Sequence, residues 1–124
     1  MQIRGLDFVL VSVSDIERSA AFYGETLGLR QMAGFSSVWY EFDAGGSTIA
    51  LGKPPPEAPQ PPYNNGLSIA LAVHDAKAAV EELRARGVPI LQEAQETSVC
   101  YMALVADPDG TLLWLHQRKD GTAG

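Results

Sequence analysis

Two stretches decide the fold: Phe8-Val-Leu-Val-Ser-Val-Ser-Asp15 and, beginning sixty residues later, Ser68-Ile-Ala-Leu-Ala-Val-His-Asp75. Each stretch has the alternating character of a strand and runs into an aspartate at the start of a helical pattern. A glycine ends each pattern, Gly28 thirteen residues after the first aspartate and Gly87 twelve residues after the second. The chain is therefore two copies of one supersecondary unit.

Further strands are expected after each helix. They are predicted near Leu29–Met32, at Ser37–Phe42 and Thr48–Leu51, and then at Pro89–Gln92, Val99–Val105 and Thr111–Gln117. Each half therefore reads β-α-β-β-β. The predicted fold class is α+β, with two tandem βαβββ modules.

A proline-rich segment separates the two halves, because six of the eight prolines fall between positions 54 and 62. Such a run can neither continue a helix nor sit in a central strand, so we expect it to be extended and semi-rigid. The predicted organisation is one domain over 1–124. It divides into a first module over 1–52, a linker over 53–66, a second module over 67–118 and a flexible tail over 119–124.

Composition and charge exclude several classes of protein. The chain has 124 residues, 46% of them hydrophobic, and a net charge of −6, with its basic residues scattered. A basic face for nucleic acid is absent, and no run approaches the roughly 20 apolar residues that span a bilayer. The start lacks the pattern of a signal peptide, so we expect a cytoplasmic protein. The lone Cys100 is expected to be a buried thiol rather than a nucleophile.

Strand parity divides the side chains between the helix side of the sheet and the opposite face. Val38, Tyr40 and Phe42 are predicted on the helix side, as are Met102 and Leu104. The opposite face mixes large aromatics with very small residues. Its candidate ligand-binding residues are Phe8, Leu10, Trp39, Glu41, Ala50, Ser68, Ala70, Tyr101, Ala103, Trp114 and His116. Such a mixture is typical of a small-molecule cleft; an aromatic subunit interface, or both together, are the alternatives.

Four motifs carry a family resemblance: Val13-Ser-Asp-Ile-Glu-Arg-Ser-Ala-Ala-Phe-Tyr23, Leu27-Gly-Leu29, Thr48-Ile-Ala-Leu51 and Ala106-Asp-Pro-Asp-Gly-Thr111. Together they resemble the vicinal oxygen chelate superfamily, the group of glyoxalase I, bleomycin-resistance proteins and extradiol dioxygenases. The resemblance covers nearly the whole chain. It implies that the paired βαβββ modules form a cupped mixed sheet with the helices on its outer face. It also implies a homodimer and a site between or beside the modules.

The resemblance also implies four positions at which catalytic members bind a divalent metal through His and Glu. In this sequence those positions hold Phe8, Ala50, Ser68 and Trp114. None of these side chains is a good metal ligand, because phenylalanine and alanine lack a donor atom, indole N–H only donates and serine binds zinc or iron poorly. His74 and His116 do not restore a set of three or four ligands. We therefore expect no metal and no cofactor.

The leading hypothesis is a metal-free small-molecule binding protein of the glyoxalase/bleomycin-resistance type, with drug sequestration as one role. Its ligand would be aromatic or amphipathic, and Glu41 with the acidic surface would favour a neutral or cationic one. The alternative is a metal-independent enzyme that uses Glu41 and His116 as base and acid for proton transfer, lyase or isomerase chemistry. A metal-dependent lyase or dioxygenase is less favoured. In another reading the aromatic face has no ligand and is buried between subunits.

Overall fold

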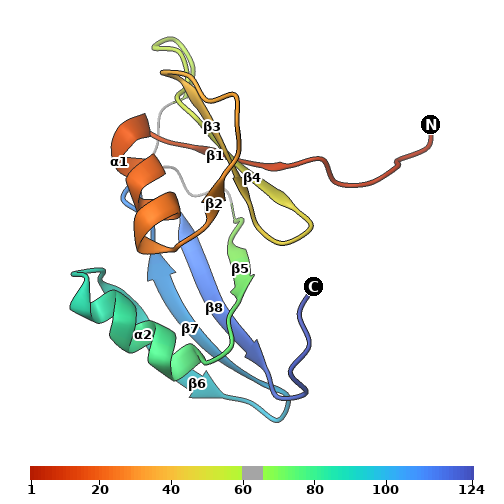
Figure 1. Ribbon diagram of the computed structural model, residues 1–124, viewed down its shortest axis with the longest axis vertical. Helices are drawn as coiled ribbons and strands as arrows, with labels where there is room; N and C mark the ends of the chain where they lie inside the picture. Colours follow the sequence, from red (N-terminus) through yellow and green to blue (C-terminus); the bar gives the residue numbers. More distant parts are fainter. Residues whose placement is uncertain (60–65) are drawn as a thin grey trace. The chain divides into compact units, whose positions relative to one another are not determined.

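The computed structural model describes residues 1–59 and 66–124, which form two compact units, one on each side of residues 60–65. Each unit contains one four-stranded mixed sheet and one α-helix of its own (Figure 1). The order of elements in each unit is β-α-β-β-β, with one extra helical turn in the first unit. The chain is thus an α+β protein made of two tandem βαβββ modules, as the sequence predicts.

Unit 1 is a sheet with the strand order β1-β4-β3-β2. Its elements are β1 (Val9–Ser12), α1 (Ile16–Ala21), the π-helical turn η1 (Phe22–Thr26), β2 (Arg30–Gln31), β3 (Trp39–Asp43) and β4 (Thr48–Gly52). Strands β1 and β4 are parallel, while β4, β3 and β2 are antiparallel neighbours. Because β1 pairs only with β4 in this sheet, it forms one edge.

The helix of unit 1 begins where the aspartate motif predicts. The Asp15 carboxylate accepts a hydrogen bond from the backbone N–H of Arg18 at 3.1 Å and caps the first turn. The last turn widens into η1, in which the N–H of Leu27 donates to the carbonyl of Phe22 at 2.8 Å. Gly28, at φ 78°, then reverses the chain.

The core of unit 1 lies between this helix and the sheet. The buried side chains come from α1 and η1 on one side and from alternate residues of the strands on the other: Val11, Val13, Ile16, Phe22, Tyr23, Phe42, Ile49 and Leu51. The rings of Tyr23 and Phe42 lie 6.3 Å apart between centroids. A Cβ at Gly24 would lie 3.1 Å from the Phe42 ring, so the glycine lets the helix approach the sheet.

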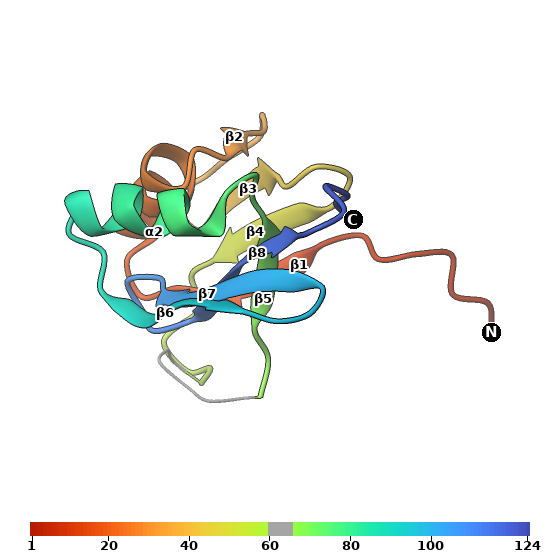
Figure 2. The same ribbon diagram turned by 90° about the horizontal axis from the view of Figure 1, so that it is seen from below.

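Unit 2 repeats this plan with the strand order β5-β8-β7-β6. Its elements are β5 (Ile69–Ala72), α2 (Ala76–Ala85), β6 (Ile90–Glu96), β7 (Cys100–Ala106) and β8 (Leu112–Arg118). Strands β5 and β8 are parallel, and β8, β7 and β6 are antiparallel neighbours. Helix α2 contacts β6, β7 and β8, and Figure 2 shows it along one side of their sheet. It buries Ala76, Val80 and Leu83 there.

Two side chains cap α2 at its start. The Asp75 carboxylate accepts from the N–H of Ala78 at 3.0 Å, and the side-chain oxygen of Gln117 accepts from the N–H of Ala76 at 2.9 Å. The second cap comes from the last strand, 41 residues away in sequence. It therefore ties the helix start to β8 as well as satisfying a free backbone donor.

The face predicted for β7 is wrong. Val105 pairs with Leu113 and Ala103 with Leu115, and all four of these residues are buried on the α2 side of the sheet. Tyr101 therefore lies on that side as well, and the ammonium of Lys77 from α2 is 5.3 Å from its ring centroid. Met102 and Leu104, predicted beneath the helix, take the opposite face. A register shift of one residue exchanges the two faces of a strand, and that is the error here.

Smaller differences concern the ends of elements. Val38, predicted in the core, precedes β3 and is 52% exposed, because the strand begins only at Trp39. Of the predicted linker 53–66, residues 60–65 lie outside the described part of the chain; before them, the N–H of Ala58 donates to the carbonyl of Pro55 in a turn. In the predicted tail 119–124, the carbonyl of Gly124 accepts a hydrogen bond at 3.1 Å from the side chain of Arg118, the last residue of β8.

Candidate functional site

Each sheet has one side without a helix, here called the helix-free face of its unit. In unit 1 the register places Leu10, Ala50 and Glu41 side by side across β1, β4 and β3. The next row contains Ser12, Gly52 and Trp39. Phe8 immediately precedes β1. All five residues predicted for this half, Phe8, Leu10, Trp39, Glu41 and Ala50, therefore lie on one face.

Aromatic packing covers the middle of this face. The Phe8 and Trp39 rings meet edge to face, with centroids 5.7 Å apart and planes at 89°. A Cβ at Gly52 would lie 3.4 Å from the Trp39 ring and 3.0 Å from Leu10, so the glycine makes room for both side chains. Ala50 is fully buried although no helix lies on its side, while Phe8 and Leu10 remain 42% and 50% exposed.

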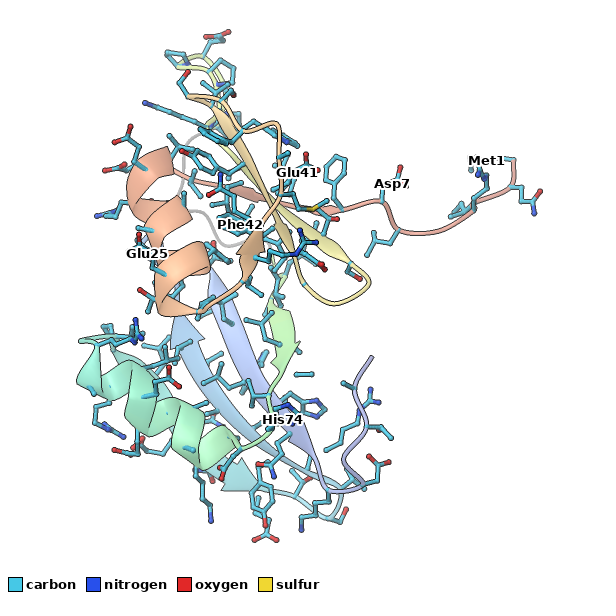
Figure 3. The ribbon with its side chains drawn as sticks, viewed as in Figure 1. Met1, Asp7, Glu25, Glu41, Phe42 and His74 are labelled. Carbon is cyan, nitrogen blue, oxygen red and sulfur yellow. The ribbon has the colours of Figure 1, made fainter. Side chains whose placement is uncertain are left out.

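Two carboxylates on β3 have different surroundings. Arg30 of β2 binds Asp43 at 2.8 Å, and this hydrogen bond lowers the pKa of the Asp43 carboxyl below its ordinary value. The half-buried Glu41 carboxylate has no hydrogen bond or ion pair with any residue of the described ranges. Figure 3 shows Glu41 on the side of β3 away from α1, and Phe42 on the α1 side. The free carboxylate can accept hydrogen bonds or pair with a cation.

The helix-free face of unit 2 contains small residues beside one indole. Ala70 is the register partner of Trp114 on β8, and Ala72 is the partner of His116. Leu104 and Met102 of β7 flank the same two residues on the other side. Trp114 and His116 are half-buried, whereas Ser68, Ala70 and Ala72 are exposed. The predicted residues Ser68, Ala70, Trp114 and His116 therefore share this face.

A hydrogen bond joins two of these residues. The Trp114 indole N–H donates to the hydroxyl oxygen of Ser68 at 3.2 Å, although the two residues are 46 positions apart. The bond fixes the edge of the indole against the start of β5.

The structure separates other predicted residues. Tyr101 and Ala103 lie on the α2 side, so they are not part of the helix-free face. Met102 and Leu104 take their place on this face, although both were predicted beneath the helix. The turn after β7 could have indicated the correct face. In that turn the N–H of Asp107 donates to the carbonyl of Thr111, and this bond fixes the register of the β7–β8 hairpin. Glu41 belongs to unit 1 and His116 to unit 2, so neither unit alone contains this acid–base pair.

The Tyr101 ring is part of a separate cluster at one end of unit 2. The ammonium groups of Lys77 and Lys119 each lie 5.3 Å from its centroid. Lys119 donates to the Glu96 carboxylate at 2.6 Å, which lowers the pKa of Glu96 and raises that of Lys119. Nearby, the buried Cys100 thiol lies 3.1 Å from the Thr97 hydroxyl.

The donor set does not fit a divalent metal. At the four positions that the resemblance assigns to ligands, Phe8 packs against Trp39, Ala50 is covered, and Trp114 donates to Ser68. Within residues 1–59 and 66–124, no three His, Cys, Asp or Glu side chains gather as a metal site requires. His74 is exposed at the start of α2, where Asp75 is the N-cap.

Residues 5–115 match the Glyoxalase/Bleomycin resistance protein/Dioxygenase superfamily. The chain belongs to this superfamily. Among curated members, lactoylglutathione lyase of Salmonella typhimurium is 29% identical over 128 residues, which cover 93% of each chain. The lactoylglutathione lyase of Escherichia coli O157:H7 is 28% identical with the same coverage.

Solved structures of similar proteins share the fold. TnmS3, an antibiotic binding protein from Streptomyces sp. CB03234, is 27% identical with a TM-score of 0.77, over 96% of this chain and 99% of its own. A member from Sphaerobacter thermophilus is 24% identical with a TM-score of 0.76, over 93% and 98%. In the described part of this superfamily member, no helix has the length and apolar character needed to cross a membrane.

Proposed function

We propose that the chain is a metal-free small-molecule binding protein, and that the helix-free face of each unit contains residues that can bind a ligand. The ligand is aromatic or amphipathic, and drug sequestration is one role consistent with it. The proposal keeps two expectations from the sequence, a homodimer and a cytoplasmic location.

One observation carries the metal-free part of this proposal. The four positions that would hold metal ligands contain side chains without suitable donor atoms: Phe8 packs against Trp39, Ala50 is buried, and Trp114 donates a hydrogen bond to Ser68. A site that needs three or four His, Glu or Cys ligands cannot form from such residues. TnmS3, which is 27% identical to this chain, is an antibiotic binding protein, and this supports binding as the function.

The chemistry of the two faces supports an aromatic ligand. Trp39 and Trp114 offer flat rings at faces that also contain very small residues. An aromatic pair of good geometry contributes about 0.5–1.5 kcal/mol beyond the area that it buries. The free Glu41 carboxylate and the net charge of −6 favour a neutral or cationic molecule over an anion.

Indole fluorescence tests the binding proposal, because the two tryptophans of the chain lie on these faces. Purified protein is titrated with 1-naphthylmethylammonium, with neutral 1-naphthylmethanol, and with a panel of aromatic and cationic antibiotics. We expect saturable quenching by several of these compounds, and a smaller response in Trp39→Leu and Trp114→Leu. Val99→Leu, at an exposed site near the β6–β7 turn, serves as the control variant. No saturable response across the panel contradicts the proposal.

A second candidate is a lyase, which the two curated relatives described above favour because both are lactoylglutathione lyases. The two functions differ in their need for a metal. We expect elemental analysis to find no stoichiometric zinc, nickel, manganese or iron, and we expect no lactoylglutathione lyase activity with or without added Zn²⁺ or Ni²⁺. A tightly bound metal that survives dialysis, together with such activity, would establish the lyase instead.

A further inference from the structure

The hydrogen bond between Trp114 and Ser68 determines what the serine hydroxyl can still do. An indole N–H has no acceptor capacity, so the Ser68 oxygen must be the acceptor at 3.2 Å. The hydroxyl proton of Ser68 therefore points away from the indole N–H and is not used in this hydrogen bond. Within the described ranges, Ser68 makes no second hydrogen bond, and its side chain is exposed. A hydroxyl that accepts one hydrogen bond is polarised and becomes a stronger donor of its own proton.

The surroundings make this donor usable by a flat molecule. Trp114 has Ala70 beside it on β5 and Leu104 beside it on β7, and the next residue on this face of β5 is Ala72. Alanine side chains rise little above the strand, so the indole can be approached from the β5 side. The hydroxyl of Ser68 stands at the edge of that ring. A molecule that stacks on the indole would bring its own edge to the hydroxyl.

We infer that Ser68 is a specificity-determining residue that donates a hydrogen bond to a carbonyl oxygen of a planar ligand lying on Trp114. This inference rests on the proposed function and narrows its ligand class to planar aromatic ketones, esters or amides. Trp114 acts both as the stacking surface and as the group that positions the hydroxyl. A ligand of the same shape without the carbonyl loses this bond.

The experiment compares 1-indanone with indane, which have the same bicyclic frame and differ in the ketone. Binding is followed in ¹H–¹⁵N spectra through the indole N–H resonance of Trp114, identified by its loss in Trp114→Phe. Two variants of Ser68 are informative. Ser68→Thr keeps the hydroxyl, and Ser68→Val has nearly the shape of threonine but lacks the hydroxyl. Their backbone amide spectra show directly whether each variant is folded as the wild type is.

We expect 1-indanone to bind wild type and Ser68→Thr about fivefold more tightly than Ser68→Val, the effect of one net hydrogen bond. Indane should bind all three proteins equally. If both fragments bind and the ratio of their affinities is unchanged in Ser68→Val, the role of Ser68 is overturned while the proposed function stands. If neither fragment nor any aromatic compound of the panel shifts the indole resonances, both ideas fail together.

Discussion

Glu41 and Asp43 lie two residues apart on β3, yet their charges are available to different degrees. Arg30 binds Asp43 at 2.8 Å and neutralises it, whereas Glu41 has no partner among the described residues. Of the two, only Glu41 can therefore offer its full charge to a ligand on the helix-free face of unit 1. Its neighbours in the register, Ala50 and then Leu10, are apolar, which strengthens an ion pair formed there.

We predict that Glu41→Gln weakens the binding of 1-naphthylmethylammonium about fivefold, as the loss of a partly shielded ion pair implies. The affinity for 1-naphthylmethanol should not change, because that molecule has the same ring system without the charge. Glu17→Gln, which removes a carboxylate from the exposed side of α1, is the matched control. Fluorescence titration measures all of these affinities. An equal loss for the charged and the neutral compound would contradict an electrostatic role of Glu41.

At the scale of the elements, the sequence predicts strands well where one of their faces is distinctly aliphatic. In β1, Val9 and Val11 alternate with Leu10 and Ser12, and the structure has the predicted faces. Strand β7 differs, because its residues 101–105 are all apolar and carry no alternation. Only the hairpin register could assign its faces, and that register pairs Ala106 with Leu112 across the turn that follows β7.

Contacts between distant residues were also beyond prediction. The bond from Trp114 to Ser68 and the cap from Gln117 to Ala76 each join residues more than forty positions apart. Nothing in local spacing distinguishes such a pair from two solvated side chains. The positions of Phe8, Leu10, Trp39 and Glu41 could be predicted because parity alone decides them.

The register of β7 predicts that truncating a smaller side chain destabilises the protein more than truncating its larger neighbour. Val105 is fully buried on the α2 side, whereas the larger Leu104 is half-buried on the helix-free face. We expect Val105→Ala to lower the free energy of unfolding by about 2 kcal/mol, through lost burial and the cavity that it leaves. Leu104→Ala should cost less. Urea denaturation followed by circular dichroism measures both, and the reverse order would contradict the observed register.

The Glu96–Lys119 pair links β6 to the residue after β8 and gives a pH dependence of known sign. The hydrogen bond from Lys119 holds the pKa of the Glu96 carboxyl below its ordinary value. A lowered carboxyl pKa contributes stability that is present above the ordinary value and is lost as the pH falls through the folded one. In Lys119→Met we expect the Glu96 pKa, measured by NMR titration of the carboxyl carbon, to rise. An unchanged value would show that the pair does not form in solution.

At the scale of the whole molecule, the open question is whether a ligand or a second chain covers the helix-free faces. Apolar side chains are exposed in both units; among them are Leu6, Phe8, Leu10, Phe35 and Val38 in unit 1, and Leu67, Leu91, Val99 and Leu112 in unit 2. Exposed apolar residues in this number favour burial against a partner. Several of them, such as Leu6, Phe35 and Leu91, are not among the residues proposed to bind the ligand. A homodimer can therefore form while the helix-free faces remain available.

We accordingly predict that light scattering gives twice the 13.3 kDa mass of the chain, both for the wild type and for Leu10→Lys. The lysine would place a positive charge in the same register row as Glu41, so the affinity for 1-naphthylmethylammonium should fall severalfold while the dimer persists. A wild type with the mass of one chain would exclude the dimer. A dimeric wild type that becomes monomeric as Leu10→Lys would show that this face is the subunit interface, because the buried charge then opposes association rather than ligand binding.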